Sequence, residues 1–451
     1  MKKIAALIFY VFLLFVICSC SGTAEEAELN ETINTEIDLD FDGATFRFGS
    51  VWINEYLIDE GVSESGDKMN ARYKEIEEKF NIKYELITTS ESLIMQNTAA
   101  GLPESIPDFA DISGNGAYGL YEKDILFPFD EITTMDAGSV KYGSHNFVNN
   151  GAEWGGHQWC IYPNNWQMVP QYSGLLVFNL ELLQKNNIEK TPYEYLETNS
   201  WTWDNFEILL KQLTFTEGAD KYFGLSVENI SWFADSAVLS NGGSAVIKKP
   251  DGTYAFGYGE KEAVEALEWM ANLKKSGYIY STNGALQLSK GKIAFEYCQS
   301  YNATLPFEPY YPFTLPSYGI ITFPWGPSGE YGVDCGAFVI FNRRFICCIA
   351  TSENDKEQLG YIIEYLYEPL NGDEALSWQK KLKYNLQQEA DIDNFLWMFN
   401  NVGYNFSGEL TGAATLLNSA MTKIYNGKET VPAAVEAVAS AANQSIIDYF
   451  N

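Results

Sequence analysis

Along this chain, segments in which apolar and polar residues alternate, as in strands, take turns with segments in which apolar residues have helical spacing. Apolar and polar residues alternate over 46–48, apolar residues recur every three or four positions over 69–80, and alternation returns over 82–86. A strand, a helix and a second strand in that order are typical of a parallel pair joined by a crossover helix. A further strand is expected within 105–113. The chain is therefore predicted to have an α/β fold.

Composition narrows the possible partners. A length of 451 residues favours two domains, and 46% apolar residues is ordinary for a globular protein. The chain has 60 acidic and 29 basic residues and a net charge of -31, which repels nucleic acid and disfavours phosphorylated or uronic ligands. Aromatic residues make up 15% of the chain, and their flat faces suit flat, uncharged ligands. A neutral ligand and no nucleic-acid partner are expected.

The N-terminus has the features of a targeting segment. Two lysines precede an apolar run over residues 4–17, which is shorter than the about 20 residues that a helix needs to cross a membrane. The Cys-Ser-Cys-Ser that follows resembles a bacterial lipoprotein signal, in which a cysteine is lipidated and becomes the new N-terminus. Cys20 fits that position because small Ser19 precedes it. Residues 1–19 are predicted to be a signal peptide and Cys20 the lipidated residue, with an ordinary secretory peptide as the alternative.

Residues 20–43 are predicted to be an acidic tether. Between residues 21 and 42 the chain carries eight acidic residues and no Lys or Arg, and it has few side chains that could form a core. The folded part is expected to begin at residue 44. Its five cysteines are irregularly spaced and contain no C-x-x-C, so neither a full disulfide framework nor a zinc site is predicted.

Catalytic and cofactor motifs are either missing or in the wrong context. Residues 114–119 match G-x-G-x-x-G. A dinucleotide-binding motif directly follows the first strand of the fold, whereas at least two strands are expected before this segment. The segment is interpreted as a loop at the carboxyl end of a strand, where open α/β sheets place ligands. Residues 38–43 resemble the start of a calcium loop, but the twelfth position is Gly49 instead of Glu. The chain contains no G-x-S-x-G, H-E-x-x-H or P-loop motif and only two histidines, so no catalytic residue, cofactor or metal is predicted. A carboxylate pair of glycosidase type stays open as an alternative, because its spacing is spatial.

Six segments, taken in order, carry a resemblance to a known family. They are Gly174-Leu-Leu-Val-Phe-Asn179, Trp201-Thr-Trp-Asp-Asn-Phe206, Ser240-Asn-Gly-Gly243, Gly291-Lys-Ile-Ala-Phe295, Tyr318-Gly-Ile-Ile-Thr-Phe-Pro324 and Ile424-Tyr-Asn-Gly427. They resemble the extracellular solute-binding proteins of carbohydrate type, which are lipoproteins that serve ABC importers, over residues 44–451. In the second segment Thr202 is expected to cap a helix, and Trp201 and Trp203 are assigned to packing.

The resemblance implies a two-lobed, periplasmic-binding-protein-like α/β fold with a ligand cleft between the lobes. The chain is expected to cross between lobes three times, at Ser173–Phe178, at about Tyr331–Gly336 and near Asn400. The N-lobe would then comprise residues 44–172 and 337–400, and the C-lobe residues 173–336 and 401–451.

The resemblance also implies which residues bind the ligand. Four candidates follow N-lobe strands, two match C-lobe positions where the family has cleft aromatic residues, one is an acid that follows a C-lobe strand, and one lies in a Gly/Asn-rich loop before the first crossing. In that order they are Trp52, Asn54, Ser113 and Asn115, then Trp232 and Tyr301, then Glu296, then Trp166. For Glu296 the alternative is a solvated acid. Trp232 is expected in a loop, because the residues around it show neither helical nor strand periodicity. For each aromatic residue, packing in the core or a loop is the alternative.

The function implied is that of a substrate-binding component of an ABC transporter. It would capture a neutral mono- or oligosaccharide and deliver it to the permease subunits, as a monomer anchored by lipid on the extracytoplasmic face of the cell membrane. It would not be an enzyme. The alternatives are an anchored glycoside hydrolase that degrades polysaccharides and an adhesive glycan-binding protein, and a peptide ligand also stays open.

Overall fold

The computed structural model describes most of the chain after residue 38. The described residues are 39–142, 152–163, 171–281, 284–304, 315, 317–339, 344–370, 382, 383, 386, 388–404, 410 and 412–450. The predicted signal peptide, Cys20 and the tether as far as residue 38 lie outside them, and so does Trp166. Among the described residues, no helix combines the length and the apolar character needed to cross a membrane.

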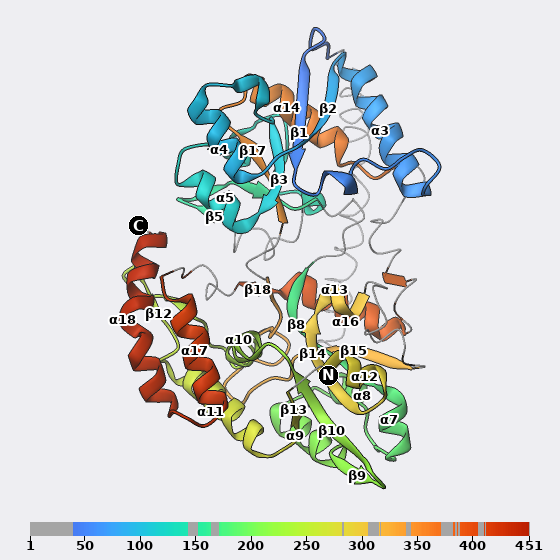
Figure 1. The fold of residues 1–451 in the computed structure, drawn as a ribbon, viewed down its shortest axis with the longest axis vertical. Coiled ribbons are helices and arrows are strands. Elements are labelled where there is room, and N and C mark those ends of the chain that lie inside the picture. The colour runs from blue at the N-terminus through green and yellow to red at the C-terminus, as the bar shows by residue number, and fades with distance from the viewer. Residues whose placement is uncertain are drawn as a thin grey trace, which may run out of the picture.

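The described residues form two bodies, stacked along the long axis of the molecule (Figure 1). The upper body comprises residues 39–163 and 344–370 as far as they are described, and its sheet has the order β2-β1-β3-β17-β4, with β7 also paired to β17. Its strands are β1 (Thr45–Ser50), β2 (Lys83–Thr88), β3 (Phe109–Ser113), β4 (Leu126–Phe127), β7 (Cys160–Ile161) and β17 (Arg344–Ile349), and a small hairpin joins β5 (Glu153–Trp154) to β6 (His157–Gln158).

Helices cover both faces of the upper sheet. They are α3 (Glu64–Phe80), α4 (Glu91–Ala100), α5 (Gly114–Tyr121) and α14 (Lys356–Leu366). Apolar residues of α3 and α14 share one core cluster with β1, and those of α4 and α5 share another with β3. The helix α3 begins where the Ser63 side chain accepts a hydrogen bond from the Gly66 amide, and it ends at Asn81 in the left-handed conformation.

The lower body contains the larger sheet. Within the described residues its order is β13-β10-β14-β8-β16-β18, with β15 also paired to β8 and β9 to β10. The strands are β8 (Tyr172–Asn179), β9 (Phe215–Glu217), β10 (Asp220–Val227), β13 (Ile279–Tyr280), β14 (Ile293–Gln299), β15 (Tyr318–Thr322), β16 (Phe338–Val339) and β18 (Gly403–Tyr404), and β11 (Val246–Lys248) pairs with β12 (Tyr254–Phe256) in a separate hairpin.

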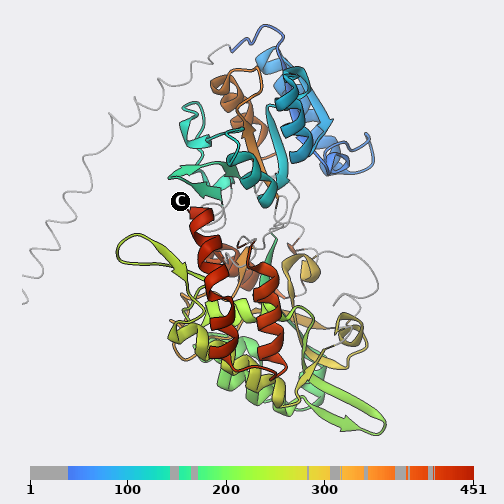
Figure 2. The same cartoon turned by 60° about the vertical axis from the view of Figure 1, so that its left-hand side comes forward.

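Helices pack around this sheet, and the last two run side by side (Figure 2). The helices are α7 (Leu180–Lys185), α8 (Pro192–Glu197), α9 (Trp203–Gln212), α10 (Ile230–Ser240), α11 (Lys261–Lys275), α12 (Gly284–Ser289), α13 (Ser300–Thr304), α16 (Glu389–Asn401), α17 (Ala414–Tyr425) and α18 (Val431–Phe450). The end of α18 approaches the upper body (Figure 2). There, burial chiefly raises the pKa of Tyr118 to about 12, and the charges of Glu122 and, more weakly, Asp448 of α18 add to the shift.

The strand β8 is the centre of the lower sheet. It pairs antiparallel with β14, β15 and β16, and all of its residues are buried. Gly174 in this strand has φ +100, and a Cβ there would lie 2.2 Å from the Gly336 carbonyl oxygen. The position therefore requires glycine, which tolerates both the backbone angle and the close approach.

The boundaries between the bodies differ from the predicted ones. The predicted first crossing, Ser173–Phe178, lies inside β8 of the lower sheet, and the predicted second crossing at 331–336 also precedes a strand of the lower sheet, β16. The chain changes body between residues 163 and 171, between 339 and 344, and between 370 and 389.

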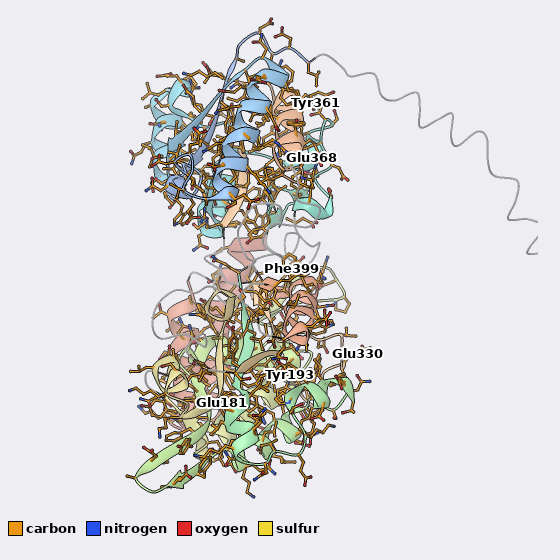
Figure 3. All side chains as sticks on the ribbon, turned by 90° about the vertical axis from the view of Figure 1, so that its right-hand side faces the viewer. Glu181, Tyr193, Glu330, Tyr361, Glu368 and Phe399 are labelled. Atoms are coloured by element: carbon orange, nitrogen blue, oxygen red, sulfur yellow. The ribbon has the colours of Figure 1, made fainter. Side chains whose placement is uncertain are left out.

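Helix α16 accounts for most of the difference, because residues 337–400 were predicted to lie in one lobe. Figure 3 places Glu368 in the upper body and Phe399 in the lower body. Asp391 of α16 accepts hydrogen bonds from the Ile320 amide of β15, at 2.8 Å, and from the Tyr193 hydroxyl of α8. The Asn394 amide donates to the Ile320 carbonyl at 3.0 Å. These bonds fix α16 to the lower sheet.

The local predictions agree with the structure at most positions. The parallel pair β1 and β2 is joined through α3 as expected. Trp201 is fully buried and donates from Nε1 to the Thr322 carbonyl at 2.9 Å, and Trp203 stacks on Trp269 with ring centres 4.3 Å apart. Thr202 occupies the cap position of α9, but its side chain makes no capping hydrogen bond.

One sequence interpretation is corrected in detail. The G-x-G-x-x-G segment is not a loop, because residues 114–121 form α5 directly after β3. The five described cysteines, whose pairing the sequence left open, are free thiols. The sulfur atoms of Cys160 and Cys347 lie 3.2 Å apart on the neighbouring strands β7 and β17.

Candidate ligand-binding site

The predicted N-lobe residues gather at one edge of the upper sheet. β1 and β3 are parallel neighbours, with Ser50 in register with Asp111, so the residues that follow them emerge at the same edge. This is the edge that faces the lower body in Figure 1. The carboxyl ends of parallel strands are where open α/β sheets bind ligands.

A buried ion pair lies under this edge. The Arg344 guanidinium bonds to both carboxylate oxygens of Asp111, and Asp111 also accepts from the Tyr56 hydroxyl at 2.9 Å. Arg344 reaches Glu55 at 2.6 Å. Burial raises the pKa of Asp111, while the hydrogen bond and charge of Arg344 oppose that shift. Because Asp111 is 1% exposed, its charge depends on this partner.

Trp52 lies on top of the ion pair. The Arg344 guanidinium carbon is 4.2 Å from the centre of the Trp52 ring, within the range of a cation–π contact. The Trp52 amide donates to the Ser50 hydroxyl at 2.9 Å. Trp52 is half-buried and Asn54 is exposed. The edge of the upper body thus presents an aromatic ring with one face held in place.

Ser113 and Asn115 lie at the start of α5. The Ser113 side chain accepts from the Gly116 amide at 3.2 Å, so its hydroxyl oxygen already serves as the helix cap. Asn115 is exposed in the first turn. Of the two, Asn115 has the freer side chain for a ligand.

The lower body contains a pocket at the carboxyl ends of β10 and β14. These strands are parallel neighbours, with Ser226 in register with Glu296. The pocket has a volume of about 250 Å³. It is lined by Glu228, Asn229, Trp232, Ala285, Glu296, Tyr297, Cys298, Gln299 and Asn302.

Glu296 is the deepest acid of this pocket. Glu296 is 7% exposed, and its Oε2 has no hydrogen-bond partner among the described residues. Burial raises the pKa of Glu296 to about 8, and the charge of Glu228 adds to the shift. Glu228 is exposed and accepts from the Gly284 amide at 2.7 Å. The two acids therefore share a pocket but differ in solvation.

Trp232 is not in a loop, as the sequence suggested, but in the first turn of α10. The Asn229 side chain caps that helix by accepting from the Trp232 amide at 3.1 Å. The Trp232 carbonyl accepts from the Tyr297 hydroxyl at 2.7 Å. Trp232 is half-buried and lines the pocket with Glu296. Two of the predicted residues thus meet in one cavity.

Tyr301 lies in α13, which directly follows β14. Only its backbone is described. Helix α13 lies on the side of the lower body that faces the upper body (Figure 1). Of the predicted residues that the structure describes, four therefore lie on the upper body and three on the lower body, while Trp166 lies outside the described residues.

Several side chains at these edges were missed by sequence reasoning. They are Glu55, Asp111 and Arg344 in the upper body and Glu228, Asn229, Gln299 and Asn302 in the lower body. Asp111 had a signal, since an acid inside an apolar strand needs a buried partner. Glu228 and Asn229 follow the last apolar residue of β10, which marks them as strand-end residues.

The chain belongs to the bacterial extracellular solute-binding protein family, whose profile matches residues 71–371, more than half of the chain. Membership of this family implies an extracytoplasmic location. A search of curated protein sequences found no match.

Solved structures share the fold at low sequence identity. The cyclic α-maltosyl-1,6-maltose binding protein from Arthrobacter globiformis has a TM-score of 0.65 at 14% identity, over 90% of this chain and 100% of that chain. A sugar transporter from Rhizobium etli in an open conformation has a TM-score of 0.63 at 14% identity, over 89% and 99%. An ABC substrate-binding protein from Listeria monocytogenes in complex with cycloalternan has a TM-score of 0.56 at 17% identity, over 90% and 99%. The two-lobed fold of these proteins is the fold of this chain.

Proposed function

We propose that this protein is the substrate-binding component of an ABC importer and that it captures a sugar or short oligosaccharide. The observation that carries the proposal is the pocket at the ends of β10 and β14, where Trp232 supplies an aromatic face and Glu296 a polar group. Aromatic rings bind the apolar faces of sugars, while amides and carboxyls bind the hydroxyls. Family membership and the sugar-binding function named for its structural neighbours support the same conclusion.

In the proposed mechanism the two bodies close on the ligand. Trp52, Asn54, Ser113 and Asn115 would contact it from the upper body, and Trp232, Glu296 and Tyr301 from the lower body, with Trp166 as a further candidate. A ligand that contacts both bodies binds the closed form better and shifts the population toward it. No reaction is catalysed. The loaded protein would act as a monomer and release its ligand to the permease subunits.

The protein would be held at the cell membrane by a lipid on Cys20, exposed on the extracytoplasmic face. The support is the short apolar run before Cys20 and the acidic stretch after it. Replacing Cys20 with Ala should release the protein from washed membranes and leave its melting temperature unchanged. A variant that stays membrane-bound after a high-salt wash would exclude this anchor.

The function itself is tested by binding and by the fate of the ligand. A thermal-shift panel of mono- and oligosaccharides should identify stabilising ligands, since a ligand at 100 times its Kd adds about 2.7 kcal/mol. Chromatography after overnight incubation should recover the ligand intact. Cleavage products would instead favour a glycoside hydrolase, and failure of every sugar to bind would overturn the proposal.

A further inference from the structure

The two acids of the lower pocket differ in whether they have a partner. Glu228 is solvated and accepts from the Gly284 amide. Glu296 is only 7% exposed, and its Oε2 accepts no hydrogen bond from the described residues. A buried carboxylate without a partner is unfavourable. Glu296 therefore offers an unpaired acceptor atom to a group that binds in this pocket.

The lining offers no positive charge to Glu296. Apart from Glu228, its other polar side chains are neutral, chiefly the amides of Asn229, Gln299 and Asn302, and none of the residues that line the pocket is Lys, Arg or His. Burial and the charge of Glu228 both oppose ionisation of Glu296 and raise its pKa. A cationic group in the pocket would reverse this balance, since an opposite charge favours the ionised carboxyl.

The same pocket also has the parts needed to hold a sugar ring. Trp232 lines one side, and its amide is fixed by the Asn229 cap. The volume of about 250 Å³ lies just below the usual range of ligand pockets, which is about 300–1,000 Å³. It suits one ring of a ligand better than a whole chain. An indole face next to carboxylates also attracts a bound cation.

We propose that this pocket receives a protonated amino group of the ligand, so that the sugar captured by this protein is an amino sugar or an oligosaccharide that contains one. The proposal rests on the proposed function and specifies its substrate class. Glu296 and Glu228 would accept hydrogen bonds from the ammonium group, while Trp232 covers the ring. Charge-assisted hydrogen bonds of this kind are about twice as strong as neutral ones. The two acids would also repel uronic and phosphorylated sugars.

Calorimetric titration of the purified protein with three matched sugars tests this proposal. The probes are glucosamine, N-acetylglucosamine and glucose, each also as its β-1,4-linked disaccharide, at pH 7. The amino member of each set should bind at least about tenfold more tightly than its acetylated and hydroxyl counterparts. Equal or tighter binding of the neutral members would overturn the inference and leave the proposed function intact. If no sugar of any class binds, the proposed function and the inference fail together.

Substitutions assign the preference to the pocket. Glu296→Gln should remove the preference for the amino sugar, so that the ratio of the amino-sugar affinity to the hydroxyl-sugar affinity falls from at least about tenfold to near one. Glu228→Gln should reduce the same preference in part, and it serves as the second test because Glu228 is exposed and its replacement leaves the core intact. Glu181→Gln is the matched control, since Glu181 lies on the surface of the lower body outside the pocket (Figure 3). A preference that survives both pocket substitutions would place the amine elsewhere.

Discussion

The Arg344 guanidinium lies over the ring of Trp52, 4.2 Å from its centre, while it bonds to Asp111 beneath. Arg344 begins β17, and Trp52 follows β1, so two segments distant in the sequence build one surface. The bonds to Asp111 and Glu55 orient the guanidinium, which in turn supports one face of the indole. The ring of Trp52 is thus oriented before any ligand arrives, which reduces the entropy cost of binding.

Arg344→Met should destabilise the upper body strongly. It leaves Asp111 ionisable, 1% exposed and without its cation, which typically costs about 3–5 kcal/mol. Urea unfolding should report this loss. Arg47→Met, which breaks the partly exposed pair with Glu85, is the control and should cost about 1 kcal/mol or less. Equal losses in the two variants would contradict the buried pair.

The stability of the protein should depend on Glu296 in a defined pH range. Burial raises the pKa of Glu296 from 4.5 to about 8, so the folded protein keeps a proton that the unfolded chain releases. The free energy of unfolding should therefore fall as pH rises from about 4.5 to about 8, by up to roughly 1.4 kcal/mol per pH unit. Above about pH 8 it should level off.

Glu296→Gln should remove this part of the pH dependence. The measurement is the difference in unfolding free energy between wild type and variant at several pH values, because Asp391, with a pKa raised to about 6, titrates in both proteins. Glu228 and Cys298 are ionisable groups near Glu296, and both are present in the wild type and in the variant, so their contributions cancel in the difference. A difference that stays constant with pH would contradict the raised pKa.

Trp232→Ala should weaken ligand binding, whereas Trp201→Ala should lower the stability of the protein. Trp232 lines the pocket, and loss of its buried aromatic face should cost about 1.5–3 kcal/mol of binding, roughly a 10- to 150-fold loss of sugar affinity. Trp201 is fully buried, and its removal should cost about 3–5 kcal/mol of stability instead. Calorimetric titration and a thermal melt of both variants separate the two effects, and the reverse pattern would remove Trp232 from the site.

Asp391→Ala should weaken the attachment of α16 to the lower sheet. The change leaves the buried Ile320 amide without its acceptor, at a cost of about 1–3 kcal/mol. Asp393→Ala, two residues further along the same helix on its exposed side, should have little effect. Hydrogen exchange of the Ile320 amide checks the result directly, since it should accelerate only in the first variant.

Local patterns in the sequence were enough to predict the first strands and helices. The alternation before and after residues 69–80 predicted β1, α3 and β2 because each element shows its own periodicity. The burial of Trp201 was also predictable, because it directly precedes an amphipathic helix. The placement of Trp232 in a loop was wrong because the cap on α10 is a single residue, Asn229, within an otherwise uninformative stretch.

The borders of the two bodies could not be read from such patterns. Helix α16 buries Phe395 and Met398, an apolar stripe that would suit either sheet. The hydrogen bond from the Ile320 amide to Asp391 determines that α16 packs on the lower sheet, and it joins residues far apart in the chain. The site has the same limitation. Arg344 and Glu228 have no motif, and they become visible only when parallel strands bring their ends together.

The position of β17 has a consequence for how the protein is made. In the upper sheet β17 lies between β3 and β4, although it is the last strand of that sheet to be synthesised. At about 5–20 residues per second, a ribosome needs roughly 10–50 s to proceed from the end of β3 to the end of β17. During that interval β3 lacks one neighbour, and an open strand edge can pair with another chain. A chaperone that covers β3 during this interval would protect the nascent upper body from such pairing.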